Sequence, residues 1–250
     1  MIRALLITVG MLTLVPLGAA MADDDTSIPG AAVSWTGLYV GGHVGYGTSS
    51  SHWTHESISP YSAICSGCAI TVPGEGFSGD DAVAGGQIGY NFQYGQWVIG
   101  PEVSFSGTSF TDTHSISPGA YNQPATTTLS SKIGDTLMVT GRLGFSINDS
   151  LLIYGKGGFA SADISAAGVD TTFFNYSFDT DRRANGWTAG GGVEYRLSDG
   201  VSFAVEYAHL DFGDETLTGK IADLPDYPAK MKVSSEADTV TARLNLHPFN

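Results

Sequence analysis

The sequence predicts an all-β protein: an eight-stranded antiparallel transmembrane β-barrel with long extracellular loops and short periplasmic turns. Three observations lead to this prediction. Apolar and polar residues alternate with a period of two in eight runs, the connections between runs are alternately short and long, and seven charged residues of the runs share the polar parity. A period of two is typical of strands with two different faces. Each run has at least the roughly 9–11 residues with which a tilted strand crosses a membrane.

Residues 1–22 have the features of a cleaved secretory signal peptide: Arg3, an apolar run and an A-x-A site at Ala20-Met21-Ala22. A membrane anchor is the alternative, but the run is short for a spanning helix and no positive cluster follows it. No cysteine lies near the cleavage site, so the sequence does not indicate a lipoprotein anchor. Residues 23–34 form a short acidic periplasmic leader, and we expect the barrel to occupy residues 35–250.

Composition narrows the function. The formal net charge is −14, only 14% of the residues are charged, and 33 are glycines. The acidic composition argues against nucleic acid as a partner, because phosphate binding needs a basic surface. Two cysteines are too few for a disulfide scaffold. No segment after the signal has the pattern of a transmembrane helix, so a membrane would be crossed in strands.

The eight alternating runs follow one another with regular breaks. They are Trp35–Gly47, Ala82–Tyr94, Gln96–Ser106, Gly134–Ile147, Leu151–Ile164, Ala184–Leu197, Val201–Gly213 and Glu236–His247. Tight turns are expected at Gly95, 148–150 and 198–200, and long polar loops at 48–81, 107–133, 165–183 and 214–235. Short turns at one end and long loops at the other are the arrangement of outer-membrane barrels.

Parity assigns the two faces of each strand. Val193 and Tyr195 alternate with Glu194 and Arg196, and the other strands follow the same rule. Seven charges, three negative and four positive, share the polar parity: Glu102, Arg142, Lys156, Glu194, Arg196, Glu206 and Arg243. The interior of an eight-stranded barrel is only wide enough to be filled by side chains. We therefore expect these charges to pair inside the barrel as a lumen charge network that plugs it.

A soluble barrel of lipocalin type, with the apolar face inward, is the alternative. Against it, the apolar parity carries two sets of aromatic residues. Near the tight turns are Tyr90, Tyr94, Trp97, Phe145, Tyr195 and Phe203; nearer the long loops are Tyr46, Phe159, Trp187 and Tyr207. Two such sets match the aromatic girdles at the two interfaces of a membrane barrel. The apolar parity is therefore predicted to face lipid.

The motifs WTGLYVGGHVGYG, GGQIGYNFQYGQWVIGPEVSF, TGRLGF, YGKGGFA and GWTAGGGVEYRLSDGVSFAVEYAHLDFG occur in order along the chain. Through these motifs the chain resembles the porin-family outer-membrane β-barrel proteins of Gram-negative bacteria. These are also called outer membrane immunogenic proteins and share the barrel of the OmpA transmembrane domain. The resemblance implies an outer-membrane location, both termini in the periplasm, and a C-terminal aromatic residue recognised by the barrel-assembly machinery. Here Phe249 is penultimate and follows Pro248, which departs from that pattern.

Chemistry-bearing residues are few. Cys65 and Cys68 form a CxxC without a thioredoxin-like context or further zinc ligands, so a local disulfide is the favoured interpretation. His52, His55 and His114 lie in predicted loops and are candidates for a surface metal or haem site, although loop histidines are more often simply solvated. His43 has the inner parity and His209 the outer. We find no catalytic or phosphate-binding motif and expect neither enzyme activity nor a cofactor.

Two functions therefore stand. The first is a structural barrel with a plugged lumen, embedded in outer-membrane lipid, whose acidic loops contact host surfaces or other envelope components. The second is a narrow porin-like channel for small solutes. Surface haem or metal binding is a weaker third.

Overall fold

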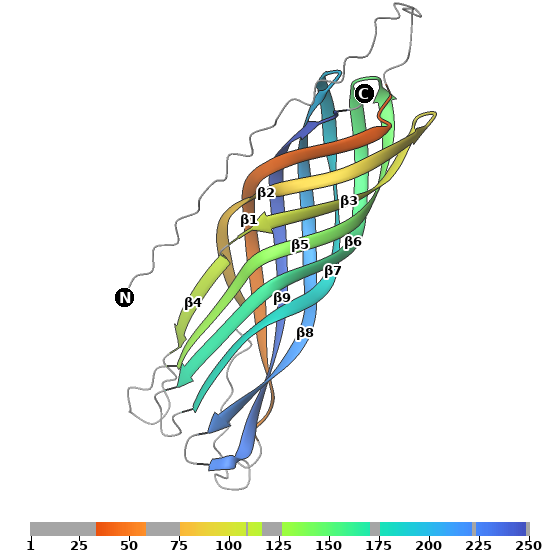
Figure 1. Ribbon diagram of the computed structural model, residues 1–250. Helices are drawn as coiled ribbons and strands as arrows, with labels where there is room; N and C mark the ends of the chain where they lie inside the picture. The colour runs from red at the N-terminus through yellow and green to blue at the C-terminus, as the bar shows by residue number, and fades with distance from the viewer. Residues whose placement is uncertain are drawn as a thin grey trace, which may run out of the picture. The chain divides into compact units, whose positions relative to one another are not determined.

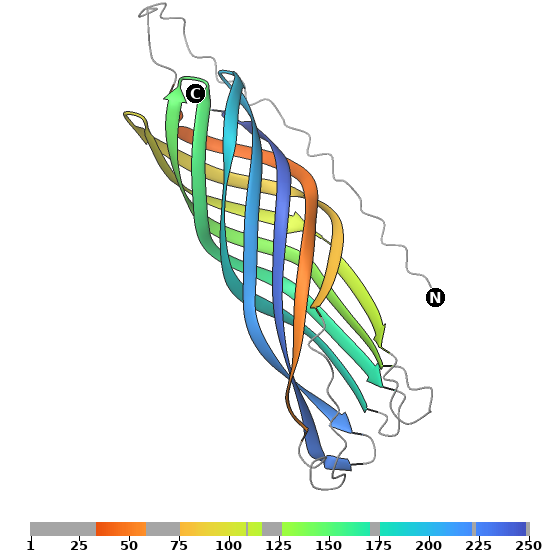
Figure 2. The ribbon, with the colours of Figure 1, turned by 180° about the vertical axis from the view of Figure 1, so that it is seen from behind.

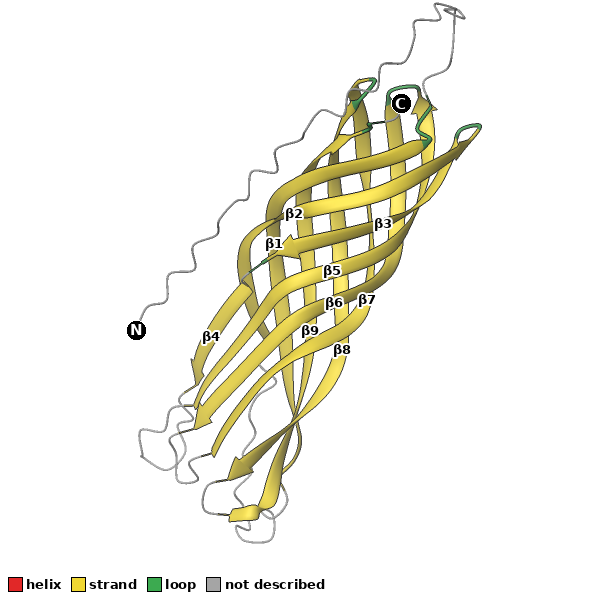
Figure 3. Ribbon diagram, in the orientation of Figure 1, coloured by secondary structure: helices red, strands yellow, loops and turns green. Residues whose placement is uncertain are grey.

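The computed structural model describes residues 34–58, 76–108, 110–116, 127–170, 176–221 and 224–248, all within one compact unit, Val33–Asn250. The described residues form strands joined by turns (Figures 1 and 3). The strands are β1 Gly37–Ile58, β2 Gly76–Tyr94, β3 Trp97–Gly107, β4 Phe110–Ile116, β5 Thr127–Asn148, β6 Leu151–Asp170, β7 Tyr176–Ser198, β8 Val201–Ile221 and β9 Leu224–Leu246. In this part of the chain no helix is long and apolar enough to cross a membrane.

The strands form one closed antiparallel ring. Their order is β3-β2-β1-β9-β8-β7-β6-β5-β4, and pairing of β3 with β5 closes the circle. Because β3 and β4 both pair with β5, one after the other, they are two parts of a single barrel strand. The nine elements therefore make eight barrel strands, as the sequence predicts. Figure 2, seen from behind, shows β9 beside β1, so the first and the last strand along the chain are neighbours in the ring.

The three tight turns fall where the sequence predicts them. Gly95 has a positive φ of 60° in the turn between β2 and β3, a conformation that glycine adopts without a steric penalty. Between β5 and β6, the Asn148 side chain accepts hydrogen bonds from the backbone N–H groups of Ser150 and Leu151, both at 2.9 Å. This side-chain cap fixes a short turn. All three turns lie at the same end of the barrel (Figure 1).

The two faces of the strands also follow the predicted parity. On β3, exposed and buried residues alternate from Trp97 to Ser106. Val193, Tyr195 and Val205 are exposed on the outer face, whereas Glu194 and Glu206 are buried inside the barrel. The exposed apolar side chains form a belt around the outside, which is the surface that a hydrocarbon layer covers.

The predicted long loops are wrong in extent. The strands continue into all four segments, 48–81, 107–133, 165–183 and 214–235, and occupy half or more of each. The cause is an inversion of polarity on several strands, clearest on β6 and β8, where the inner face turns apolar and the outer face polar; β1 keeps the buried Ser49 and Ser51 on its inner face. On β8, Leu210 and Phe212 point inward and are buried, next to the outward Asp211. Because the outer face is no longer apolar, the sequence looks like a loop, although β8 continues to pair with β9 as far as Ile221.

The inversion divides the barrel into two parts. The turn half runs from the tight turns to the outer aromatic residues Tyr46, Trp187 and Tyr207, and the loop half lies beyond them. The interior of the loop half holds an apolar cluster: Val83, Ile133, Met138, Ala160, Ala162, Ile164, Ala184, Ala208, Leu210, Phe212 and Ala237. On β8 the loop half spans Ala208–Ile221, which corresponds to a rise of about 30 Å at ordinary strand spacing and tilt.

Candidate functional site in the barrel interior

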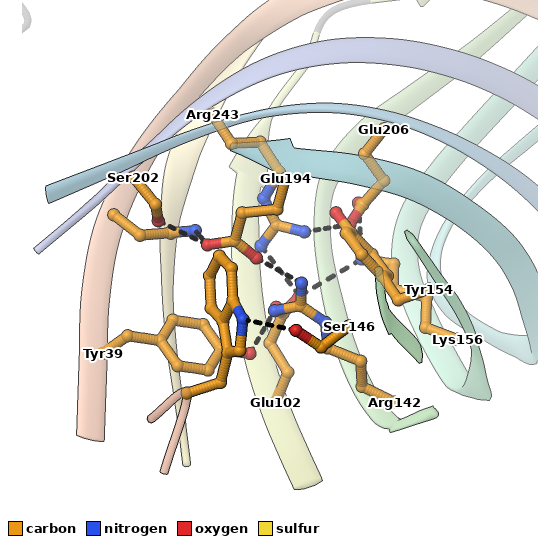
Figure 4. Close-up of polar contacts among 12 residues, drawn as sticks. Tyr39, Glu102, Arg142, Ser146, Tyr154, Lys156, Glu194, Ser202, Glu206 and Arg243 are labelled. Atoms are coloured by element: carbon orange, nitrogen blue, oxygen red, sulfur yellow. Dashed lines mark hydrogen bonds and ion pairs between the residues drawn. The ribbon is translucent and has the colours of Figure 1, made fainter. Parts of the chain in front are cut away.

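Four charged side chains meet in a ring inside the turn half. Lys156 Nζ lies 3.2 Å from Glu102 Oε1 and 2.6 Å from Glu206 Oε1. Arg243 Nη2 donates to Glu102 Oε1 at 2.8 Å, and its Nη1 pairs with Glu206. The signs therefore alternate around the ring, which joins β3, β6, β8 and β9 across the lumen (Figure 4). Each charge taken from water has two partners of opposite sign, which is the condition under which buried charges are tolerated.

A second ion pair lies beside the ring. Arg142 on β5 pairs with Glu194 on β7, and both side chains are buried. Glu194 also accepts hydrogen bonds from Ser202 and from Asn245 Nδ2, the latter at 2.8 Å. Its carboxylate is thus bonded by three side chains from three strands.

Two tyrosines link the pair to the ring. Tyr39 donates its hydroxyl to Glu102 Oε2 and Tyr154 donates to Glu206 Oε2, each at 2.8 Å. The Arg142 guanidinium lies 3.6 Å from the Tyr154 ring centroid and 5.7 Å from that of Tyr39. Stacking of a guanidinium on an aromatic face is attractive and strengthens when water is excluded. The tyrosines thus fill the space between the charges and satisfy their remaining acceptors.

Glycines directly opposite the two tyrosines on the neighbouring strands make room for these rings. A side chain at Gly89 would collide with the ring of Tyr39, and one at Gly192 would approach the hydroxyl of Tyr154. The absence of a Cβ at these two positions lets a large aromatic side chain lie across a narrow lumen.

Above the ring, towards the loop half, the interior becomes neutral. His43 bonds Gln87 Oε1 at 2.7 Å through Nδ1 and Ser106 Oγ at 2.9 Å through Nε2. A cavity of about 30 Å³ follows, with Lys156, Glu206 and Arg243 on one side and apolar residues such as Leu210 and Phe212 on the other. That volume holds about two water molecules.

Below the ring, at the end with the tight turns, Trp35 is fully buried inside the barrel. Its indole N–H donates to Ser146 Oγ at 3.2 Å, and its backbone N–H donates to Gln93 Oε1 at 2.6 Å. The Arg196 guanidinium lies 4.3 Å from the Trp35 ring centroid and donates to Ser34 O at 2.9 Å. Val98 and Leu152 complete this apolar floor.

The structure therefore brings six of the seven predicted charges together, all except Arg196. Arg196 faces the interior near the tight turns, where its guanidinium donates to the carbonyl oxygens of Ser34 and Asp199 and lies over the ring of Trp35. Sequence reasoning missed the tyrosines and Trp35. Tyr39 and Tyr154 do carry the inner parity of their strands, and that signal identifies them.

Several predicted site residues lie outside the described residues: Cys65, Cys68 and Phe249. The signal peptide 1–22 and most of the leader 23–34 do as well, so these remain predictions. His52, His55 and His114 lie on β1 and β4 rather than in loops. His43 is buried inside the barrel, and the outward His209 bonds Asp238 Oδ1 at 2.9 Å. Within the described ranges, no three His, Cys, Asp or Glu side chains are arranged to hold a metal ion.

A closed ring of eight strands with an apolar outer belt and an inner charge cluster defines an integral outer-membrane β-barrel. Residues 10–228 match the model of the outer membrane protein beta-barrel domain family, and the chain belongs to that family. It is accordingly a protein of the outer membrane. No curated protein sequence matches the chain.

Solved structures with a similar arrangement are distant in sequence. The outer membrane protease OmpT from Escherichia coli is 7% identical, with a TM-score of 0.55 over 84% of this chain and 96% of that one. OprG from Pseudomonas aeruginosa is 13% identical, with a TM-score of 0.45 over 85% of this chain and 97% of that one. The likeness to OmpT shows the fold.

Proposed function

We propose that this protein is a structural and surface-interaction barrel whose lumen is closed by its own side chains. The observation that carries the proposal is the ring of Glu102, Lys156, Glu206 and Arg243, which bridges the lumen from four strands. A hydrated ion that enters the turn half must displace ion pairs that already satisfy one another. Trp35 adds a second barrier in series, at the end with the tight turns.

The loop half supports the surface role. It extends the wall of the barrel well beyond the apolar belt, and its outer face carries exposed acidic residues such as Asp80, Asp163 and Glu236. With a formal net charge of −14 for the chain, this part presents an acidic wall to the medium. Long-range attraction favours partners of positive charge. No catalytic role is part of this proposal.

A narrow channel for small solutes is the second candidate, because the cavity above the ring already interrupts the packing of the interior. Single-channel recording in planar bilayers separates the two functions. We expect the wild-type monomer to pass no large, steady current. Trp35→Ala should behave in the same way, since it removes the floor and leaves the ring in place. A stable wild-type current comparable to that of a trimeric general porin would establish the channel instead.

A further inference from the structure

Two parts of the barrel wall in the loop half lack a backbone ladder among the described residues. One lies between β7 and β8, where no pair is formed between Ser177↔Lys220 and Trp187↔Asp211, and its β7 edge carries Arg182 and Arg183. The other lies between β2 and β4. The ladder between β2 and β3 ends at Ala84↔Gly107. Beyond this pair, β2 continues back to Gly76 with β1 as its partner, and β4 pairs with β5. Among the described residues, the facing edges of Gly76–Val83 and Phe110–Ile116 are not paired with each other or with a third strand. We call these two facing edges the seam.

The seam arises from a shift of register. Ser106 pairs with Thr136 and Phe110 pairs with Ile133, so the chain of β3 and β4 gains one residue over β5 between these points. Such a bulge bends the strand that contains it. Thr108 secures the bend by donating its hydroxyl to Gly134 O at 2.6 Å. Cα atoms of β2 and β4 still come within 8 Å of each other, but the two strands diverge towards their loop ends (Figures 1 and 2).

An unpaired edge exposes backbone donors and acceptors that readily pair with another chain. The β2 edge shows this directly at Ala82. Its N–H donates to Asp81 Oδ1 at 2.7 Å, in an exposed position. An N–H that faced β1 would bond a β1 carbonyl, so this one faces the seam. The Asp81 carboxylate accepts the hydrogen bond from this N–H, and the carbonyl oxygen of an incoming strand can take its place.

The charge of the seam selects the partner. Gly76–Val83 contains Asp80 and Asp81, Phe110–Ile116 contains Asp112, and neither segment contains lysine or arginine. An added strand would therefore place its side chains beside carboxylates. Opposite charges on neighbouring strands stabilise a pair, and like charges destabilise it.

We propose that the seam binds an extended, basic peptide segment of a partner protein, which adds to the β2 edge as a further strand. Main-chain hydrogen bonds supply affinity and the acidic residues supply selectivity, as in other cases of strand addition. The inference deepens the surface-interaction part of the proposed function and is independent of whether the lumen is closed.

The test uses the full-length protein in phosphatidylcholine nanodiscs and a fluorescent eight-residue peptide of alternating lysine and threonine. Fluorescence anisotropy should show saturable binding that weakens as salt rises. Ala82→Pro removes the seam-facing N–H and leaves the ladder to β1 intact, because proline is tolerated on an edge. We expect this variant to bind about fivefold to tenfold more weakly, the effect of one lost hydrogen bond. Heat-modified gel mobility verifies that it is folded.

Two controls separate strand addition from general attraction. The same peptide with alternate backbone nitrogens methylated keeps its charge and should not bind. Asp80→Asn with Asp81→Asn should weaken binding, whereas Glu236→Gln with Asp238→Asn, the same charge change on β9 where the strand is paired on both sides, should leave it unchanged. No binding by the wild type would overturn the proposal. Equal binding by wild type, Ala82→Pro and the methylated peptide would also overturn it, while leaving an acidic surface that attracts cations. Neither result bears on the conductance of the lumen.

Discussion

The turn half and the loop half of the barrel bury opposite kinds of side chain, although the same strands run through both. In the turn half, Glu206 faces inward and Val205 outward; in the loop half, Leu210 faces inward and Asp211 outward. The pleat is continuous, so the alternation of direction is unchanged and only the chemistry is exchanged. The difference shows that the medium around each half, hydrocarbon or water, determines whether the outward residues are apolar or polar. The inward residues then have the opposite polarity.

The interior of each half is stabilised in a different way. Hydrocarbon around the turn half favours apolar side chains on the outer face, and the charges on the inner face are stabilised by pairing with one another. Water around the loop half tolerates charges outside, and the interior is then an ordinary apolar core like that of a soluble protein. Loss of a charge should therefore be most damaging in the turn half, and loss of apolar volume in the loop half.

The largest effect is expected at Arg243, which pairs with both glutamates of the ring. Arg243→Ala leaves Glu102 and Glu206 with Lys156 as their remaining ring cation. Removal of one partner of a buried pair typically costs about 3–5 kcal/mol. Urea unfolding in lipid vesicles measures the loss. Lys232→Ala removes a half-exposed cation of the loop half and should change stability by about 1 kcal/mol or less. Equal losses for the two variants would remove the distinction between the halves.

A slightly smaller effect is expected on the outer face. Val205→Arg places a cation against hydrocarbon and should cost about 2–4 kcal/mol. Glu236→Arg, on an exposed outer position of the loop half, should remain within about 0.5 kcal/mol of the wild type. Ala204→Ser, next to Val205 but facing inward, should be nearly silent. If Ala204→Ser were the costly change, the facing assignment of β8 would be wrong.

The apolar interior of the loop half should respond to loss of volume. Leu210→Ala creates a cavity among buried apolar neighbours and should destabilise the barrel by about 2–3 kcal/mol. Leu210→Met, which nearly conserves the volume, should cost less than about 1.5 kcal/mol. Thermal unfolding followed by circular dichroism compares them. A negligible cost for Leu210→Ala would mean that the loop half has no packed core.

The smallest effect is expected from the outer pair of His209 and Asp238. Tyr207 also donates to Asp238 Oδ1, at 2.6 Å, and the site is well exposed. Asp238→Asn should change stability by about 1 kcal/mol or less, because exposed ion pairs contribute little. Urea unfolding again provides the measurement. A loss as large as that of Arg243→Ala would show that the outer network matters as much as the inner one.

Much of the turn half could be predicted from the sequence, because hydrocarbon enforces a strict alternation. That rule places Glu102, Arg142 and Glu206 on one face without any knowledge of their partners. It does not show which charges meet, since the lateral order of strands and their stagger decide this. Arg196 carries the same parity as Glu194, yet it lies one inward position closer to the turn and contacts Trp35 instead.

The loop half was harder to predict for a physical reason. Its strands are polar outside and only moderately apolar inside, so they have the composition of loops. The inverted phase at Leu210, Asp211 and Phe212 is visible in the sequence, but bulges interrupt it. One lies between Asp211 and Asp214 on β8, where Gly213 has a φ of 67°. Each bulge moves later residues to the other parity, and alternation alone cannot follow that change.

The central claim is that paired charges close the turn half, and conductance of a variant that disrupts them tests it most directly. Arg142→Ala with Arg243→Ala removes two of the three cations that pair with Glu102, Glu194 and Glu206 in the cluster and leaves Lys156. In planar bilayers we expect this double variant to pass frequent, cation-selective currents that the wild type lacks. Arg183→Ala with Lys232→Ala, the same charge change at exposed positions of the loop half, should stay closed. A folded, inserted Arg142→Ala/Arg243→Ala variant as silent as the wild type would contradict the claim.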